Sequence, residues 1–206
     1  MSVQKGLPVK VLIAAAGSSE RYGTDIPKQY QKINGKTVLR HTIEKFLKVP
    51  DIDDIRVIIN PSDADLYHDA VQGLNLPPYI EGSNSRKNSV YNGLKSFSDV
   101  KNNFKILIHD AARPLVSPED IQVVIDTLDH NQAATLGRKV PDTLRKSNYA
   151  ALDRDNTWLI QTPQGFSYQD IWKAHETFKD RDDFTDDASL IAEMGGQVHI
   201  LQSTSP

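Results

Sequence analysis

The feature that most constrains the fold of this chain is a series of short, continuous apolar runs separated by stretches with helical spacing. The apolar runs are Lys10–Ala16, Ile55–Asn60, Phe104–His109 and Ala133–Val140. Uninterrupted apolar runs are typical of strands covered on both faces, as in parallel sheets. The helix-like stretches are Val38–Lys48, Ser62–Leu74, Lys87–Ser96 and Pro118–His130. This alternation predicts an α/β fold with a doubly wound, mostly parallel sheet.

The C-terminal third departs from this rhythm. Polar residues and Tyr149 interrupt Leu144–Trp158, which we interpret as an arm covering about residues 141–160. Helical spacing then resumes in two stretches before a short apolar run that predicts a last strand; these segments are Tyr168–Phe178, Ala188–Met194 and Val198–Leu201. We expect one domain, residues 1–206, that carries this arm.

Composition excludes several classes of protein. The 206 residues suffice for one well-buried core. The net charge of −3 argues against a nucleic-acid binder, and the lack of cysteine excludes disulfides and thiolate metal sites. No apolar run approaches the roughly 20 residues of a membrane span, and the polar N-terminus does not resemble a signal peptide. We therefore expect a cytoplasmic protein.

A loop of small residues follows the first apolar run. Ala14–Gly17 leads through two serines and a glutamate to Arg21, and Lys28 lies seven residues farther on. Small residues let backbone N–H groups approach phosphate oxygens, and two fixed cations would suit a polyphosphate. The loop is neither a Walker loop nor a G-x-G-x-x-G loop. An ordinary strand-to-helix turn with solvated cations also fits it.

Two further loops carry polar candidates. In Glu81–Val90, Arg86 and Ser89 could anchor a base edge, although a helix start capped by residue 84 or 85 also fits the pattern. Asp110 and Arg113 follow the third apolar run. A carboxylate at the carboxyl end of a strand can hold a divalent metal against phosphates, and a structural Asp–Arg pair is the alternative.

Six motifs occur in a fixed order along nearly the whole chain. They are AAAGSSERYGTDIPKQY, GSNSRKNSVYNGL, IHDAARP, PDTLR, WLIQTPQGF and FTDDASLIAEMGG, and they lie between about Val9 and Leu201. Together they resemble the 2-C-methyl-D-erythritol 4-phosphate cytidylyltransferase family of the non-mevalonate isoprenoid pathway. The resemblance implies a Rossmann-like nucleotidyltransferase that transfers CMP from CTP to 2-C-methyl-D-erythritol 4-phosphate.

The resemblance also implies roles for individual residues. Those expected to be catalytic are Arg21, Lys28 and Arg154. Those expected to bind CTP are Ala15, Ala16, Gly17, Ser83, Asn84 and Ser89. Those expected to bind the polyol phosphate are Asp110, Arg113, Thr143, Thr162 and Thr185. Asp110 is further expected to approach Mg²⁺ or another divalent cation.

A homodimer is expected on the same grounds. The resemblance implies that the arm crosses the dimer interface, so that Arg154 and Thr162 reach the site from a partner chain. His109 is interpreted as a structural histidine, because the reaction needs no imidazole. Thr185 could equally act as the N-cap of the helix that follows it.

Two alternative functions remain open from the sequence. Ribitol 5-phosphate cytidylyltransferases share the expected fold and CTP loops, and a non-catalytic nucleotide-binding protein could use them as well. The family continues beyond a strand like Val198–Leu201 into an Asn-x-Lys segment, which is absent from the printed chain. The motifs QTPQGF and FTDDAS also resemble those of family members that are fused to a 2-C-methyl-D-erythritol 2,4-cyclodiphosphate synthase.

Overall fold

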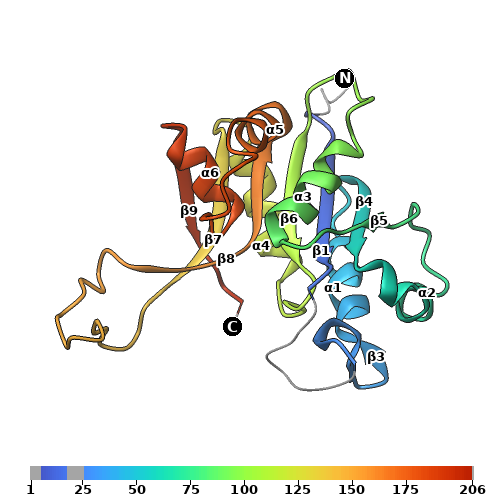
Figure 1. Cartoon of the computed structure of the whole chain (residues 1–206), viewed down its shortest axis with the longest axis horizontal. Coiled ribbons are helices and arrows are strands. Elements are labelled where there is room, and N and C mark those ends of the chain that lie inside the picture. Colours follow the sequence, from blue (N-terminus) through green and yellow to red (C-terminus); the bar gives the residue numbers. More distant parts are fainter. Residues whose placement is uncertain (1–5, 18–25, 206) are drawn as a thin grey trace.

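The computed structural model describes residues 6–17 and 26–205, and a seven-stranded sheet forms its centre (Figure 1). The strands are β1 (Val9–Ala15), β4 (Ile52–Ile59), β5 (Ile80–Glu81), β6 (Lys105–Asp110), β7 (Ala133–Lys139), β8 (Trp158–Ser167) and β9 (Val198–Gln202). Their order is β5-β4-β1-β6-β8-β7-β9. Neighbouring strands pair in parallel except β8, which runs antiparallel to β6 and β7. The predicted α/β fold with a mostly parallel sheet is confirmed.

Helices cover both faces of the sheet. They are α1 (Val38–Phe46), α2 (Ala64–Val71), α3 (Arg86–Lys95), α4 (Pro118–Thr127), α5 (Tyr168–Thr177) and α6 (Asp187–Glu193). Two single 3-10 turns, η2 (Lys28–Tyr30) and η3 (Pro61–Asp63), and a small hairpin of β2 (Lys32–Ile33) and β3 (Lys36–Thr37) complete the elements. Each helix lies where the sequence predicts one, with ends that differ by a few residues.

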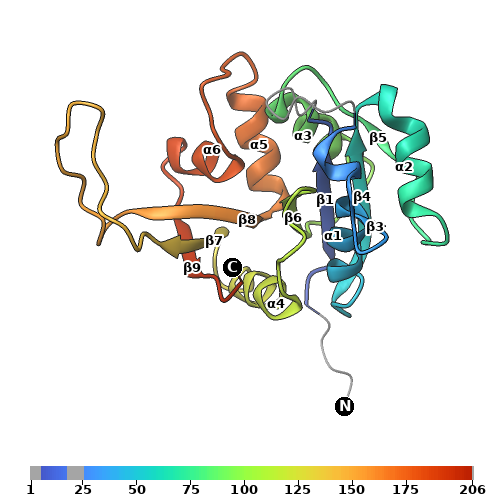
Figure 2. The same cartoon turned by 90° about the horizontal axis from the view of Figure 1, so that it is seen from below.

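Two apolar clusters, one on each face, explain why the strands read as continuous apolar runs. One cluster joins the sheet to α1, α2 and α4, and the other joins it to α3, α5 and α6. Along β1, Val11 and Ile13 belong to the first cluster and Leu12 to the second. Successive strand residues face opposite sides, so a strand covered twice needs apolar residues throughout. Figure 2 shows α5 and α6 on one side of β8 and α4 on the other.

The arm, defined here as residues 140–157, connects the end of β7 to the start of β8 and extends away from the sheet (Figures 1 and 2). Residues Arg145 and Ala151 form one antiparallel bridge near its tip. Trp158–Ile160, which the sequence assigned to the arm, instead pairs with Gly137–Lys139 as the first part of β8. In the described parts of the chain, no helix has the length and apolar character to cross a membrane.

The sheet places several loops at one edge. Because β1, β4, β6 and β7 run in the same direction, their carboxyl ends lie together, and ligands of open α/β sheets bind at such an edge. The reversed strand β8 begins at this edge, where Trp158 pairs with Lys139.

Candidate functional site

A groove of about 750 Å³ lies at this edge and is lined by all six residues predicted to bind CTP. The predicted residues that line it are Ala15, Ala16, Gly17, Lys28, Ser83, Asn84, Ser89, Asp110 and Arg113. Arg21 lies outside the described residues. The described lining contains the cations Lys28, Arg86 and Arg113 and a single carboxylate, that of Asp110. Such an excess of positive charge favours an anionic ligand.

Gln29 holds the end of β1 in shape. Its amide nitrogen donates to the carbonyl oxygens of Ala15 at 2.8 Å and Gly17 at 3.1 Å, and its side chain is buried. The bond to Gly17 fixes the backbone at the point where the small-residue loop begins. Gln29 is not among the residues predicted for the site, although it stands beside Lys28 in the first motif.

The second loop packs directly against the first. Gly82 donates its backbone N–H to the carbonyl of Ile59 at 2.7 Å, and a Cβ at residue 82 would lie 2.3 Å from the Cβ of Ala16. Real Cβ atoms do not come this close, so the approach of the two loops requires glycine here.

Ser89 shapes the second loop from within. Its buried hydroxyl accepts the backbone N–H of Ser83 at 2.9 Å and donates to the carbonyl of Ser85 at 2.8 Å. Ser85 is the N-cap of α3. The exposed side chains of Ser83 and Asn84 are left on the groove wall, where they can meet a ligand.

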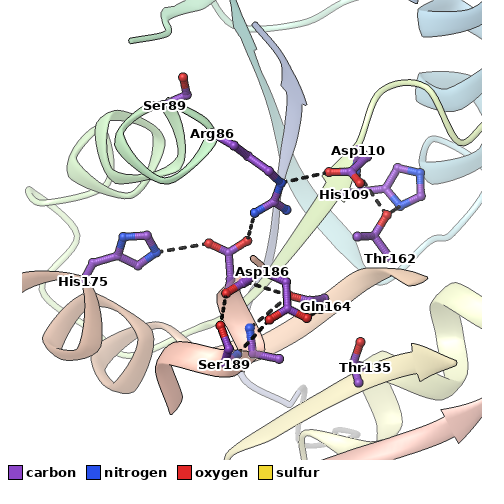
Figure 3. A network of polar contacts seen from close by, with 12 residues as sticks. Arg86, Ser89, His109, Asp110, Thr135, Thr162, Gln164, His175, Asp186 and Ser189 are labelled. Atoms are coloured by element: carbon purple, nitrogen blue, oxygen red, sulfur yellow. Dashed lines mark hydrogen bonds and ion pairs between the residues drawn. The ribbon is translucent and has the colours of Figure 1, made fainter. Parts of the chain in front are cut away.

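Arg86 is held by two carboxylates rather than directed at a base. Its Nε lies 3.2 Å from Asp110 Oδ1, and its NH1 group lies 2.7 Å from Asp187 Oδ2 (Figure 3). Asp187 is also 3.2 Å from Nε2 of the buried His175. Arg86 therefore connects the start of α3, the end of β6 and the start of α6, which the sequence alone did not indicate.

The buried end of this network is strongly charge-stabilised. Burial alone would raise the pKa of Asp187, but the positive charge of Arg86 and the hydrogen bond to His175 outweigh it and lower the pKa to about 2. The same pairing with Asp187 raises the pKa of Arg86 above its ordinary value. Both groups therefore stay ionised.

Gln164 on β8 fixes the first turn of α6. Its amide oxygen accepts the backbone N–H groups of Asp187 at 3.1 Å and Ala188 at 3.0 Å, and its nitrogen donates to Asp186 Oδ2 at 2.8 Å. Asp186, and not Thr185, is the N-cap of α6, because its side chain accepts the N–H of Ser189. Thr185 is exposed and lines a small pocket with Arg86.

Thr162 lies beside Asp110 of its own chain. Its hydroxyl oxygen is 3.1 Å from the backbone nitrogen of Asp110 and 2.9 Å from His109 Nδ1. The expectation that Thr162 reaches the site from a partner chain is therefore wrong. The reversed direction of β8 brings this early part of the strand to the carboxyl end of β6. Thr162 and Arg113 also line a second cavity of about 210 Å³ next to the groove.

The arm keeps its two predicted residues away from the groove. Thr143 and Arg154 are both exposed, and neither lines the groove. Arg154 contacts only nearby residues in the described chain, with the carbonyl of Pro141 at 3.4 Å and Asp155 at 3.8 Å. The structure thus brings the sheet-edge candidates together and leaves the arm candidates apart.

Asp110 is the residue that could hold a divalent cation. Within residues 6–17 and 26–205, no three His, Cys, Asp or Glu side chains could enclose a metal ion. Mg²⁺ is commonly bound by one or two carboxylates together with substrate phosphates. One half-buried carboxylate at the edge of a cationic groove fits that kind of site, with Arg86 and Arg113 Nε atoms at 3.2 and 3.3 Å from its two oxygens.

Comparisons with known proteins identify relatives that match most of this chain. A bifunctional enzyme IspD/IspF of Rhodospirillum rubrum is 41% identical over 198 residues, which are 94% of this chain and 51% of the relative. A 2-C-methyl-D-erythritol 4-phosphate cytidylyltransferase of Desulforamulus reducens is 34% identical over 95% of this chain and 87% of its own length. The chain spans about half the length of the bifunctional relatives it matches.

The solved structures that resemble this chain carry the same kind of name as these relatives. The 4-diphosphocytidyl-2C-methyl-D-erythritol synthase of Anaerococcus prevotii superposes with a TM-score of 0.82 at 27% identity, covering 95% of this chain and 88% of that chain. The family model described as IspD, 2-C-methyl-D-erythritol 4-phosphate cytidylyltransferase, matches residues 9–205. The chain therefore belongs to the IspD family.

Proposed function

We propose that this chain is a cytidylyltransferase that transfers CMP from CTP to 2-C-methyl-D-erythritol 4-phosphate. The observation that carries the proposal is the groove, where Lys28, Asp110 and the small-residue end of β1 meet in a chain of this family. The products would be 4-diphosphocytidyl-2-C-methyl-D-erythritol and pyrophosphate. We propose that the reaction takes place in the cytoplasm.

The reaction is an in-line displacement at phosphorus. A phosphate oxygen of the polyol phosphate forms a bond to the α-phosphorus of CTP, while the bond from that phosphorus to the bridging oxygen breaks and pyrophosphate leaves with the electron pair. The attacking phosphate is already ionised, so no protein base is needed. The main task of the protein is to position the reactants and stabilise developing negative charge.

Lys28 performs this task from the groove wall, where it would stabilise charge on the α-phosphate and the bridging oxygen. We assign Arg21 the same role from the family resemblance alone. Asp110 would hold Mg²⁺, which when bound neutralises charge on the triphosphate. The loop with Ser83 and Asn84 would contact cytosine and ribose, and Ser89 would keep this loop in shape.

The polyol phosphate would bind where β6 and β8 meet. Arg113 and Thr162 line the cavity adjoining the groove, and Thr185 lies at the start of the neighbouring helix. Arg113 is exposed at 44% of its side chain and can turn its guanidinium toward an anion.

We further propose a homodimer in which the arm of one chain completes the site of the other. The exposure of Thr143 and Arg154 supports this assembly, because residues with a predicted substrate role lie far from the groove of their own chain. A second copy could bring them to it, and two-fold dimers are the commonest symmetric assembly.

The test measures pyrophosphate release from CTP and Mg²⁺, with 2-C-methyl-D-erythritol 4-phosphate and ribitol 5-phosphate offered separately. We expect turnover with the first alcohol only. Loss of one donor to the developing charge typically lowers the rate ~100–1000-fold, so we expect Lys28→Ala to lose at least that much. Lys32→Ala removes an exposed lysine on β2 and should retain wild-type activity.

Two results would change this assignment. Turnover of ribitol 5-phosphate in preference would make the chain a ribitol 5-phosphate cytidylyltransferase. Binding of CTP with no turnover of either alcohol, in the chain extended as in its bifunctional relatives, would indicate a nucleotide-binding protein without this activity.

A further inference from the structure

His109 lies at the meeting point of three residues that the proposed function uses. It is the next-to-last residue of β6, its side chain is fully buried, and its ring packs against Phe46 with centroids 4.9 Å apart. Nδ1 lies 2.9 Å from the hydroxyl of Thr162, and Nε2 lies 3.1 Å from the carbonyl oxygen of Arg113. No step of the proposed reaction involves the imidazole itself.

The directions of these hydrogen bonds follow from the chemistry of the partners. The carbonyl of Arg113 can only accept, so Nε2 must carry the proton. Complete burial favours the neutral ring, which leaves Nδ1 as an acceptor for the hydroxyl of Thr162. The oxygen of that hydroxyl in turn accepts the backbone N–H of Asp110.

The contacts therefore form one directed chain. It runs from the N–H of Asp110 to the hydroxyl of Thr162 and from there to Nδ1 of His109 (Figure 3). From the other side of the ring, Nε2–H donates to the carbonyl of Arg113. The other neutral form of the ring, protonated at Nδ1, would leave Nε2 without a proton against the carbonyl oxygen of Arg113, so that two buried acceptors would face each other. This series of hydrogen bonds fixes the backbone at both ends of segment 110–113.

Thr42 secures the same segment from the opposite side. Its buried hydroxyl donates to the carbonyl of Ala111 at 2.8 Å, and Ala111 itself is buried. The side chains of Asp110 and Arg113 thus project from a backbone that is held at three points: at residue 110 by Thr162, at residue 111 by Thr42 and at residue 113 by His109.

We propose that His109 is a positioning residue for the polyol-phosphate half of the site, where its neutral ring sets the mutual placement of Thr162 and Arg113. This inference rests on the proposed function. It goes beyond the interpretation of His109 as a structural histidine, because it predicts an effect on one substrate only. The CTP loops around Gly17 and Ser83 have no contact with the imidazole in the described contacts.

Two substitutions at His109 each remove one of its two hydrogen bonds and keep the other. His109→Asn places an amide oxygen near Nδ1 and keeps the acceptor for Thr162, but it loses the bond to Arg113. His109→Gln places an amide nitrogen near Nε2 and keeps the donor to Arg113, but it loses the acceptor. Because one lost hydrogen bond changes an equilibrium by roughly tenfold or less, we expect each variant to raise KM for the polyol phosphate by about that factor.

The matched control is His175→Asn, which removes an equally buried histidine that contacts Asp187 instead. We expect it to lower Tm and to leave both KM values unchanged. For the His109 variants, KM for CTP should also stay unchanged while KM for the polyol phosphate rises. Equal changes in both KM values, or no change in either, would overturn the proposal and leave His109 a structural residue.

A spectroscopic measurement keeps the proposal testable where the variants fold poorly. Nitrogen-15 shifts of the wild-type His109 ring should show Nε2 protonated and Nδ1 unprotonated, with the proton exchanging slowly. A ring protonated at Nδ1 would overturn the directed chain. Absence of turnover by the wild type would instead contradict the proposed function, and the ring measurement would still decide the direction of the bonds.

Discussion

The sheet edge and the arm hold their candidate residues in opposite ways. At the sheet edge, Asp110 and Thr162 are fixed by hydrogen bonds to other parts of the same chain. On the arm, Thr143 and Arg154 are exposed, and within the described residues the side chain of Arg154 contacts Pro141 and Asp155, which lie on the arm itself. The chain therefore pre-organises one half of the proposed site by itself, whereas in the proposed dimer a second copy would fix the other half.

The largest effect should come from breaking the best-anchored contact at the sheet edge. Arg86→Gln leaves the carboxylate of Asp187, which is 1% exposed, without its cation. Removing one partner of a buried ion pair commonly costs 3–5 kcal/mol, and the partial exposure of Arg86 places the expected loss of unfolding free energy at about 3 kcal/mol. Urea unfolding measures it.

The control for this substitution is Arg181→Gln. Arg181 pairs with Asp183 and Glu193 on the surface, where ion pairs contribute little to stability. Its variant should unfold close to the wild-type urea concentration. Equal stability of the two variants would contradict the claim that the ion pair of Arg86 stabilises the fold more than the surface ion pairs of Arg181.

Acid should weaken the sheet edge in two steps. Burial lowers the pKa of His109 from 6.5 to about 4, so its stabilisation is complete above pH 6.5 and is lost as the pH falls toward 4. By linkage this loss is on the order of 3 kcal/mol. The lowered pKa of Asp187 adds a second loss between pH 3.8 and about 2. Unfolding free energies measured from pH 8 to pH 3 should therefore fall in the upper window for the wild type and stay nearly level there for His109→Gln.

A substitution on the arm should affect catalysis and leave the fold intact. Arg154→Ala removes an exposed side chain, so Tm should stay at the wild-type value while the rate falls ~100-fold through loss of one charge-stabilising donor.

Mixing Arg154→Ala with Lys28→Ala tests whether the two chains of a dimer share one site. In a random mixture of two-fold dimers about a quarter of the sites combine an intact groove with an intact arm, so activity should return to about that level. Mixtures that stay inactive would contradict the shared site.

The smallest effect should come from the threonines, compared as a pair. Thr143→Val changes an exposed residue and should shift the unfolding free energy by less than about 0.5 kcal/mol, with at most a few-fold rise in KM for the polyol phosphate. Thr162→Val leaves the buried N–H of Asp110 and Nδ1 of His109 without their hydroxyl, which should cost about 1–3 kcal/mol. Equal stabilities for the two variants would remove the distinction between sheet edge and arm.

The sequence predicted those elements that depend on residues close together in the chain. The doubly covered strand β1 needs apolar residues on both faces, and the cap of α4 needs only Ser117 and the N–H of Asp120 three residues on. The strand β8 was missed because its buried part contains Thr162, Pro163 and Gln164, which read as a loop. These polar groups are buried because residues far along the chain satisfy them, and a local pattern does not record distant partners.

The candidate site was likewise predicted only where it depends on local sequence. The loops at the ends of β1 and β6 were predicted because strand ends gather at one edge, and both line the groove. The partner of Arg86, Asp187, lies 101 residues away, so its pairing could not be derived from spacing. Arg21 falls outside the described residues, so its place at the groove stays a prediction.

The reversal of β8 has a consequence for how such a molecule can vary. Because β7 ends and β8 begins at the same edge, the arm enters and leaves the sheet through one pair of adjacent strands, fixed by the pairings of residues 137–139 with residues 158–160. Insertions or deletions between these two anchors change the length of a surface loop and leave the registers of the other strands as they are. The length of the arm can therefore change while the groove beside it keeps its geometry.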